Sequence, residues 1–379
     1  MDGCYLDHAA TTPVRAEAAA AMAECFGASF GNPASLHRAG QRARRVVESA
    51  RQCIASHLGC EPEEVIFTSG GTESDNLALR GVVAAARGKK HVVTTEIEHS
   101  AVLSCCAGLA EEGVEITRVP VERTGVVRAE AVLAAVRSDT AVVSVMLANN
   151  ETGVLQPVRE IARELRERGV AFHTDAVQAL GKMALDVDEL GVDLLSVSAH
   201  KIGGPKGVGA LYVRKGVRIA PLLRGGHQER DLRAGTENVP GIAGFGAAVE
   251  AAARELTEVA GRLARMRDGF ESAIMAGVPG VVANGGSVRR LPQISNIGFA
   301  GIEGEALLLA LDVQGISVST GSACRSGAPE GSHVLKAMGV EPELARGSIR
   351  FSLGSGNDPA QIDGVAKIVV ETVRRLRKG

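Results

Sequence analysis

The sequence predicts an α/β fold built on a mostly parallel sheet, because short β-branched runs alternate with amphipathic helical patterns from about residue 64 onward. A chain of 379 residues is long for a single core and fits a large domain with a smaller lobe. We expect strands at 64–70, 91–96, 114–121, 140–148, 170–176, 193–199 and 209–213. We expect helices between them at 72–88, 100–113, 128–138 and 158–169. Ligands of such sheets bind at the carboxyl ends of the strands, so the residues that follow the strands are the candidates for a site.

The second half of the chain has a different pattern. A long helical stretch, from about 241 to 276, leads out of the predicted large domain. Shorter strands, loops and helices follow, and the chain ends in the helical pattern AQIDGVAKIVVETVRRLRK. We therefore expect a large domain over 13–255 and a small α+β domain over 1–12 and 256–379, although the extended residues 1 to 12 are compatible with either domain.

The composition argues against several classes of function. The net charge of −2 does not favour binding to nucleic acid or to an anionic membrane. An aromatic content of 3% without Trp argues against base-stacking surfaces. The N-terminus lacks the basic and apolar segments of a secretory signal, and no apolar run approaches ~20 residues. We therefore expect a cytoplasmic protein without a membrane span.

The seven cysteines form no CxxC pair, so no metal site is predicted. Cys105 and Cys106 lie in an apolar helical run, where packing is the favoured role. Cys324 differs, because it lies in the Gly-, Ser- and Pro-rich segment STGSACRSGAPEGS, which is not compatible with regular structure. Such loops can carry a reactive thiol to a site, and Arg325 beside it can favour the thiolate. An incidental loop cysteine is the alternative.

Residues that can bind an anionic ring compound follow the predicted strands. In FTSGGTESDNLAL, Gly70, Gly71 and Thr72 stand between a strand and a helix, where backbone N–H groups and the helix N-terminus can bind a phosphate. A tight turn with a helix cap is the alternative. Asp175 can hold a protonated ring nitrogen or cap a helix, and His99 can act as an acid or base on a ring or pack as an ordinary polar residue.

Two amides and one lysine complete the candidate site. Asn150 and Gln178 can donate to a ring oxygen, although each alone is typical of a turn or a cap. Lys201, in SVSAHKIGGPKGVGALYV, ends a buried strand and is followed by glycines that leave room for a cofactor; a surface turn is the alternative. Ser198 and His200 can add phosphate contacts. Together these residues supply a Schiff-base lysine, an acidic partner for a ring nitrogen and a phosphate anchor, which is the set that pyridoxal phosphate requires.

Motifs spread over the whole chain point to one family. They are YLDHAATTP, GNPASLHRAG, FTSGGTESDNLA, EIEHSAVL, NNETGVLQP, HTDAVQALGK, SAHKIGGPKGVGALYV, RAGTEN, STGSACRSG and SIRFSLG. On these motifs the chain resembles the cysteine desulfurases of the class V (fold type I) aminotransferase superfamily. The extended segment after GSACRSG, followed by SHVLKAMG, resembles the long-loop group that serves general or nitrogenase-type iron–sulfur assembly. The resemblance implies a seven-stranded sheet in the large domain.

The resemblance also implies roles for individual residues. Lys201 would form the Schiff base, Asp175 would pair with the pyridine nitrogen, and His99 would stack on the ring and take part in proton transfer. Gln178 and Asn150 would contact the ring and the substrate. The residues implied in phosphate binding are Gly71, Thr72, Ser198 and His200, together with Thr236, which would reach the phosphate of the neighbouring subunit in a homodimer.

The resemblance implies a substrate and an acceptor as well. Arg350 would clamp the carboxylate of L-cysteine, with Asn32 near it. Cys324 would take the substrate sulfur as a persulfide, leave L-alanine, and deliver the sulfur to an iron–sulfur scaffold or a tRNA-thiolation protein. No resident metal is implied, although Cys324 could share a transferred iron–sulfur cluster with a scaffold.

Other functions are compatible with parts of the sequence. A selenocysteine lyase or another class V pyridoxal phosphate enzyme would use the same cofactor residues and need not depend on Cys324. A non-catalytic module could bind an anion at the turn formed by 70–72. A Rossmann-type dehydrogenase is disfavoured, because no GxGxxG motif follows a first strand.

Overall fold

The computed structural model describes residues 3–86, 88–320 and 331–378. Its main layer is a sheet of seven strands in the order β2-β8-β7-β6-β5-β3-β4. The strands are β2 (Val65–Thr68), β3 (His91–Thr95), β4 (Glu115–Val119), β5 (Thr140–Ser144), β6 (Ala171–Asp175), β7 (Leu194–Ser198) and β8 (Gly209–Val213). The strands from β7 to β4 pair in parallel, whereas β8 is antiparallel to β7 and to β2. The predicted mostly parallel, seven-stranded sheet is confirmed.

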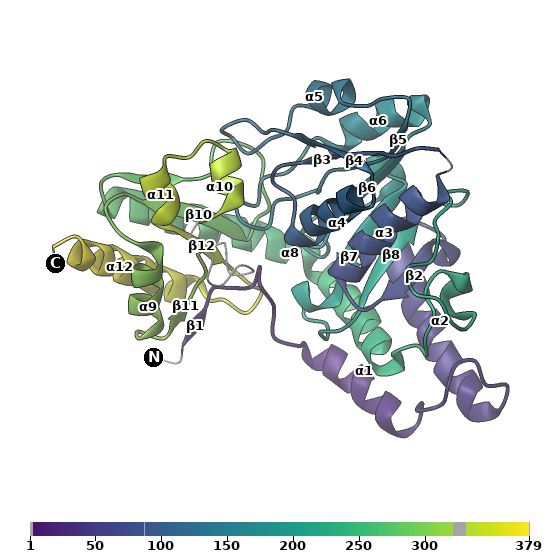
Figure 1. Cartoon of the computed structure of the whole chain (residues 1–379). Coiled ribbons are helices and arrows are strands. Elements are labelled where there is room, and N and C mark those ends of the chain that lie inside the picture. Colours follow the sequence, from purple (N-terminus) through teal and green to yellow (C-terminus); the bar gives the residue numbers. More distant parts are fainter. Residues whose placement is uncertain (1–2, 87, 321–330, 379) are drawn as a thin grey trace.

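Helices cover both faces of this sheet (Figure 1). Successive side chains of a strand point to opposite faces, so neighbouring residues enter different cores. Val92 and Val142 pack with residues of α3 (Gly71–Ala85) and α4 (Ser100–Glu111), whereas Val93 and Val143 belong to the core on the other face. The helices of that face are α2 (Arg38–Leu58), α5 (Ala129–Ala134), α6 (Val158–Arg168), α7 (Val187–Leu190) and the first part of α8 (Val239–Gly277).

Two N-terminal helices were not predicted from the sequence. α1 (Ala16–Gly27) and α2 both pack against α8. The buried side chains Val47, Ile54 and Leu58 form the apolar stripe by which α2 joins the core. α2 ends at Gly59, whose φ of 70° is left-handed and therefore suits glycine.

A second core lies around the end of α8 and the C-terminal part of the chain. It includes a three-stranded antiparallel sheet in the order β12-β10-β9. The elements of this part are β9 (Val281–Ala283), β10 (Ile294–Phe299), α9 (Gly304–Asp312), α10 (His333–Ala337), α11 (Pro342–Arg346), β12 (Ser348–Ser352) and α12 (Pro359–Leu376). A parallel pair, β1 (Cys4–Tyr5) and β11 (Ile316–Ser317), attaches the N-terminus to this core. The predicted long helix and C-terminal helix correspond to α8 and α12.

Residues 7–12 connect the second core to the carboxyl edge of the large sheet. Asp7 forms a bridge with Ser352 in β12. Thr12 N–H then donates to the His200 carbonyl at 3.0 Å, directly beside Lys201. The chain therefore passes between the two cores at the edge where the candidate residues lie. Within the described ranges, we find no helix with the length and apolar character needed to span a membrane.

Candidate active site

The strand ends gather the predicted residues at one edge of the large sheet. Asp175 is the last residue of β6, and Lys201 ends a short 3-10 helix, η2 (Ala199–Lys201), that follows β7 directly. His99 precedes α4, where its Nδ1 accepts from the Ala101 N–H at 3.2 Å. One ring nitrogen of His99 and one carboxylate oxygen each of Asp175 and Asp75 lie within 4.8 Å of one another. Asp75 was not predicted.

A small pocket lies at the same sheet edge. Its volume is about 320 Å³, and its lining includes Ser69, Gly71, Thr72, Ser198, His200 and Lys206. The lining therefore includes the four residues that the family resemblance assigns to phosphate binding within one subunit: Gly71, Thr72, Ser198 and His200. The backbone is closely packed here, since a Cβ atom on Gly71 would lie 2.8 Å from Val177 Cγ2 and one on Gly209 would lie 2.7 Å from Gly70 Cα. Burial, helped by Lys201 and Lys206, lowers the pKa of His200 to about 4 and keeps the ring neutral near pH 7.

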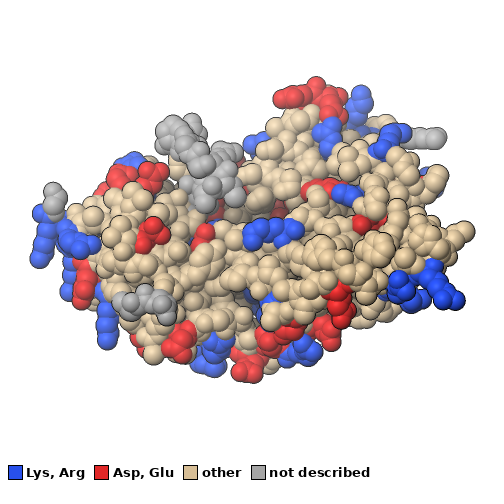
Figure 2. All heavy atoms as spheres, turned by 90° about the horizontal axis from the view of Figure 1, so that it is seen from below, with Lys and Arg blue, Asp and Glu red and all other residues tan. Residues whose placement is uncertain are grey.

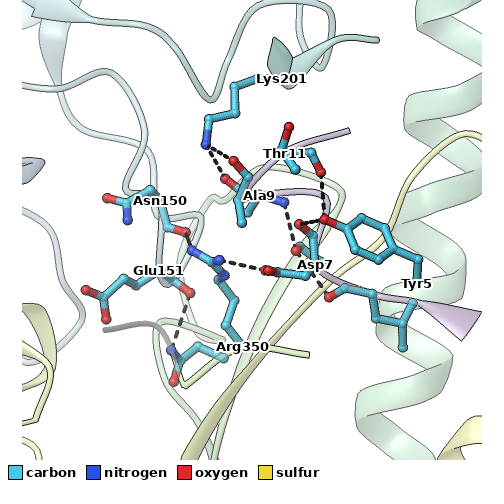
Figure 3. Close-up of polar contacts among 12 residues, drawn as sticks. Tyr5, Asp7, Ala9, Thr11, Asn150, Glu151, Lys201 and Arg350 are labelled. Atoms are coloured by element: carbon cyan, nitrogen blue, oxygen red, sulfur yellow. Dashed lines mark hydrogen bonds and ion pairs between the residues drawn. The ribbon is translucent and has the colours of Figure 1, made fainter. Parts of the chain in front are cut away.

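The Lys201 ammonium lies against the N-terminal segment of the chain. Its Nζ donates to the carbonyls of Ala9 and Ala10 at 2.6 and 2.7 Å, as Figure 3 shows. Gln178 Nε2 donates to the same Ala9 carbonyl at 2.9 Å. The amine is therefore held beside Gln178 by main-chain oxygens, which a reaction partner of Lys201 can replace.

The Asp175 carboxyl is buried and 6% exposed. Its Oδ1 accepts from the Val177 N–H at 2.9 Å. Burial raises the pKa of Asp175, while His99, the Val177 N–H and Lys201 oppose this shift. A cationic ring nitrogen beside this carboxyl would also lower the pKa of Asp175 and would therefore favour the Asp175 carboxylate.

Arg350 in β12 forms the second part of the site. It is 3% exposed, its Nη1 donates to the Asn150 carbonyl at 3.0 Å, and its Nη2 donates to Asp7 Oδ1 at 2.8 Å (Figure 3). Its buried Nε has no hydrogen-bond partner in the described part of the chain. A buried guanidinium with a remaining donor is suited to a carboxylate ligand.

Two acids at this position were not predicted from the sequence. Asp7 pairs with Arg350, and Glu151 follows Asn150 directly. Glu151 is 2% exposed, and its Oε2 accepts from Ser332 Oγ at 2.5 Å. Their motifs, YLDHAATTP and NNETGVLQP, were singled out, but only the folded contacts identify these acids as part of the site.

Two predicted residues are not brought to the site within one chain. Asn32 is exposed, and its Oδ1 accepts from the Ala34 N–H at 2.9 Å. Asn32 lies in the turn between α1 and α2, and Figure 1 shows this turn far from β12. Thr236 is also exposed. Cys324 and Arg325 lie outside the described residues, so the predictions for them remain predictions.

The arrangement fits pyridoxal phosphate. The pocket lined by Gly71, Thr72, Ser198 and His200 offers hydroxyl and N–H donors beside the N-terminus of α3, as an anionic phosphate requires. Asp175 offers a buried acid for a ring nitrogen. Lys201 offers an amine at the same sheet edge, so the three groups that the cofactor needs are present together.

Comparison with known proteins gives the same assignment. The family model "Aminotransferase class-V" matches residues 4–365. The chain is similar to a cysteine desulfurase IscS of Dictyoglomus turgidum, at 48% identity over 98% of this chain and 95% of that protein. It is also 48% identical to a cysteine desulfurase IscS of Methanosarcina thermophila, over 98% of this chain and 92% of that protein.

Solved structures share the architecture. A NifS-like protein at 39% identity superposes with a TM-score of 0.92 over 99% of this chain and 100% of its own. A second NifS-like protein, from Rickettsia africae, gives a TM-score of 0.87 at 31% identity over 98% of this chain and 99% of its own. The chain belongs to the aminotransferase class-V family.

Proposed function

We propose that this chain is a pyridoxal phosphate-dependent cysteine desulfurase, which removes sulfur from L-cysteine and releases L-alanine. One observation carries the proposal. Lys201, Asp175 and the phosphate-type pocket lie at one sheet edge, and the buried Arg350 is joined to that edge through the Asn150 carbonyl. The similarity to cysteine desulfurases over nearly the whole chain supports the same reaction.

The cofactor would be held by residues of the large sheet edge. Gly71, Thr72, Ser198 and His200 would bind the phosphate, and Asp175 would hold the ring nitrogen in its protonated form. His99 would lie on the ring, with Gln178 and Asn150 near its substituents. We assign these residues to a large domain over 13–255, with a small domain over 1–12 and 256–379.

The substrate would be oriented by its carboxylate. Arg350 would bind that carboxylate. Asp7, whose Oδ1 accepts a hydrogen bond from Arg350 Nη2, would either keep this hydrogen bond beside the substrate or give it up to the substrate carboxylate. This orients the Cα atom toward Lys201.

When bound, the cofactor supplies an aldehyde for the amines and a sink for the electrons of Cα. Lys201 would move the proton at Cα, because its amine lies at the sheet edge where the substrate would be held. The thiolate of Cys324 would then attack the substrate sulfur. The carbon–sulfur bond breaks, a sulfur–sulfur bond forms, and the electron pair returns to the carbon that becomes the methyl group of alanine. The net reaction of L-cysteine with a Cys324 thiol therefore gives L-alanine and a Cys324 persulfide.

The other cysteines support Cys324 in this role. The described residues contain six free cysteines: Cys4, Cys25, Cys53, Cys60, Cys105 and Cys106. Burial raises the pKa of each of these thiols, for example to about 11 for Cys4 and about 12 for Cys106, so they stay protonated near pH 7. Cys324 is the seventh cysteine of the chain and the candidate that remains.

We also propose that the chain works as a homodimer. Phe26, Phe30 and Leu36, at the end of α1 and in the following turn, are 70%, 72% and 89% exposed. Figure 2 shows the molecule from below, the side on which Figure 1 places α1, and residues other than Lys, Arg, Asp and Glu cover much of this face. Exposed aromatic side chains of this kind are typical of protein interfaces. In the dimer, Thr236 would reach the neighbour's phosphate, and Asn32 would gain partners that it lacks in one chain. A sulfur-acceptor protein, such as an iron–sulfur scaffold, would then collect the persulfide.

The experiment is an absorption spectrum of the purified chain, taken before and after L-cysteine, with alanine measured in the same sample. We expect a cofactor band that changes with L-cysteine and alanine that accumulates. Lys201→Ala should lose the band of the lysine-bound cofactor, and Cys324→Ala should keep the band but lose sulfur transfer. A wild-type chain that binds no cofactor, or binds it and forms no alanine, would refute the proposal.

A further inference from the structure

Asp75 is a buried acid beside the cofactor site with no role in the proposed reaction. It lies in the first turns of α3, is 1% exposed, and faces the core rather than solvent. Its Oδ1 is fully buried, and no described N–H or O–H group donates a hydrogen bond to it. An ionised carboxylate in such a place would need donors on both oxygens, because burying an unpartnered charge is very costly.

The groups around Asp75 are mostly acids or neutral. A carboxylate oxygen of Asp75 lies within 4.8 Å of one from Asp175 and of a His99 ring nitrogen. His173 Nε2 is 3.6 Å from Asp75 Oδ1, which is too long for a hydrogen bond. The third acid of this region is Glu98, which is fully buried; its Oε1 accepts from Thr95 Oγ1 at 2.7 Å and from the Met146 N–H at 3.0 Å.

His173 does not provide a cation for Asp75. Its two ring nitrogens are engaged by the hydroxyls of Ser144 and Ser196, each at 2.9 Å. Burial lowers the pKa of His173 to about 3, so the ring is neutral. With Asp175 as a like-charged neighbour, an ionised Asp75 would be repelled, and the Ser196 hydroxyl would offset this repulsion and the cost of burial only in part.

We propose that Asp75 is a neutral carboxylic acid that serves as a positioning residue for Asp175, donating its proton toward the Asp175 carboxylate. The single negative charge of the acid pair is then concentrated on Asp175, where a ring nitrogen would be bound. The effect on cofactor binding by Asp175 rests on the proposed function. The protonation of Asp75 is a property of the chain itself and does not depend on that function.

The electrostatic surroundings support this assignment. Burial raises the pKa of Asp75 well above its ordinary value, and the Asp175 carboxylate adds to this shift. The Ser196 hydroxyl acts in the opposite direction, and Glu98 raises the pKa further. A donor beside Asp175 stabilises its ionised form, which is the form that a protonated ring nitrogen requires.

The test is the infrared spectrum of the carboxylic acid carbonyl, measured in the presence of a chelator on the holoenzyme and on the chain without cofactor. The difference between wild type and Asp75→Asn should contain an acid band at about pH 7, where Asp and Glu are ordinarily ionised. Glu98→Gln is the matched control, because the acid band that this substitution removes should titrate near pH 8, the value to which burial raises the pKa of Glu98.

A difference spectrum between wild type and Asp75→Asn with only carboxylate bands at pH 7 would overturn the proposal. If Asp75→Asn fails to fold, wild type containing carbon-13-labelled aspartate must show a shifted acid band at pH 7, and its absence would equally overturn the proposal.

Cofactor affinity gives the second readout. Asn keeps a neutral donor at position 75, whereas Leu keeps the size and removes the donor. We expect Asp75→Leu to bind pyridoxal phosphate about tenfold more weakly than Asp75→Asn, as loss of one buried hydrogen bond to a charged group implies. Equal weakening by Asn and Leu would contradict the proposal. A wild-type chain that binds no cofactor would instead refute the proposed function and leave the infrared result standing.

Discussion

The surroundings of Glu151 determine its protonation state, which can be tested through the pH dependence of folding stability. It is 2% exposed and accepts a hydrogen bond from Ser332, which caps the N-terminus of α10. Burial raises its pKa to about 7, against the lowering effects of Ser332, Arg350 and His99. A raised pKa means that the folded state binds the proton more tightly than the unfolded state, so folding stability from this group falls as pH rises from about 4 to 7.

We predict that Glu151→Gln removes this pH dependence. The free energy of unfolding of the variant should exceed that of wild type by up to about 3 kcal/mol at pH 8 and match it near pH 4. Denaturant unfolding of both proteins across this range measures the difference. Glu63→Gln, at an exposed position, controls for the loss of one carboxylate. A difference between wild type and Glu151→Gln that does not change with pH would contradict this account of Glu151.

Site residues were predictable where the strand pattern alone located them. Asp175 lies at the end of one predicted strand, and His99 and Lys201 closely follow two others, so the topology brings them together without further information. Asp7 and Glu151 were missed, because their partners Arg350 and Ser332 lie 343 and 181 residues away along the chain. Asp75 left a readable signal, since it stands at helical spacing from the buried Leu79 and Val82 and thus occupies a core position.

At the scale of elements, one short helix is held in an unusual conformation. In η3 (Gln228–Asp231), Glu229, Arg230 and Asp231 have φ values of 45°, 57° and 65°. Left-handed backbone costs roughly 1–2 kcal/mol for each such residue. Arg51 donates to both carboxylate oxygens of Glu229, at 2.7 and 2.8 Å, and the Phe67 N–H donates to Glu229 at 2.8 Å. This buried ion pair therefore fixes the turn that precedes Thr236.

We predict that Glu229→Gln lowers the free energy of unfolding by about 3 kcal/mol, because it leaves the buried Arg51 charge with only the half-exposed Glu48 as an acidic partner. Glu48→Gln is the matched control, since Glu48 contacts the same guanidinium at 3.2 Å from a half-exposed position. Its effect should stay below about 1 kcal/mol. Denaturant unfolding compares the two variants, and equal effects would show that burial of the Glu229 pair has no special importance.

Elements with strict periodicity were predicted well, and those that depend on distant contacts were not. Short runs of apolar, β-branched residues identified the strands of the large sheet, because most of these strands face a core on both sides. The stripe of Val47, Ile54 and Leu58 in α2 was present in the sequence and was overlooked. The left-handed turn of η3 was not predictable, since it depends on a contact between Arg51 and Glu229, which are 178 residues apart.

At the scale of the whole molecule, the site lies where the two cores meet. α8 contributes to both cores, with Val239 and Phe245 in the first and Phe270 and Ile274 in the second. The N-terminal segment from Asp7 to Thr12 crosses the same boundary and contacts both Arg350 and Lys201. The residues proposed to bind the cofactor and the arginine proposed to bind the substrate carboxylate thus come from different parts of the chain. This explains why the sequence could suggest their roles but not their contacts.

The proposed dimer predicts that an interface charge weakens cofactor binding. Phe30→Asp should give monomers, because a buried unpaired charge in an apolar interface is costly, and the monomer should bind pyridoxal phosphate more weakly without the neighbour's Thr236. Sedimentation velocity and cofactor titration measure the two effects. Val313→Asp is the control, since Val313 is 89% exposed at the end of α9 and its replacement should leave the dimer intact. A Phe30→Asp protein that remains dimeric would show that this turn is not the interface.

The central claim is that sulfur from L-cysteine is transferred to Cys324. Mass spectrometry of the peptide that contains Cys324, taken after a brief reaction with L-cysteine and without reductant, tests it most directly. We predict one added sulfur atom on Cys324 in the wild-type chain, and none after Lys201→Ala, because the reaction then lacks its lysine. Alanine formation with sulfur on a different cysteine, or with no sulfur bound to the chain, would contradict the account.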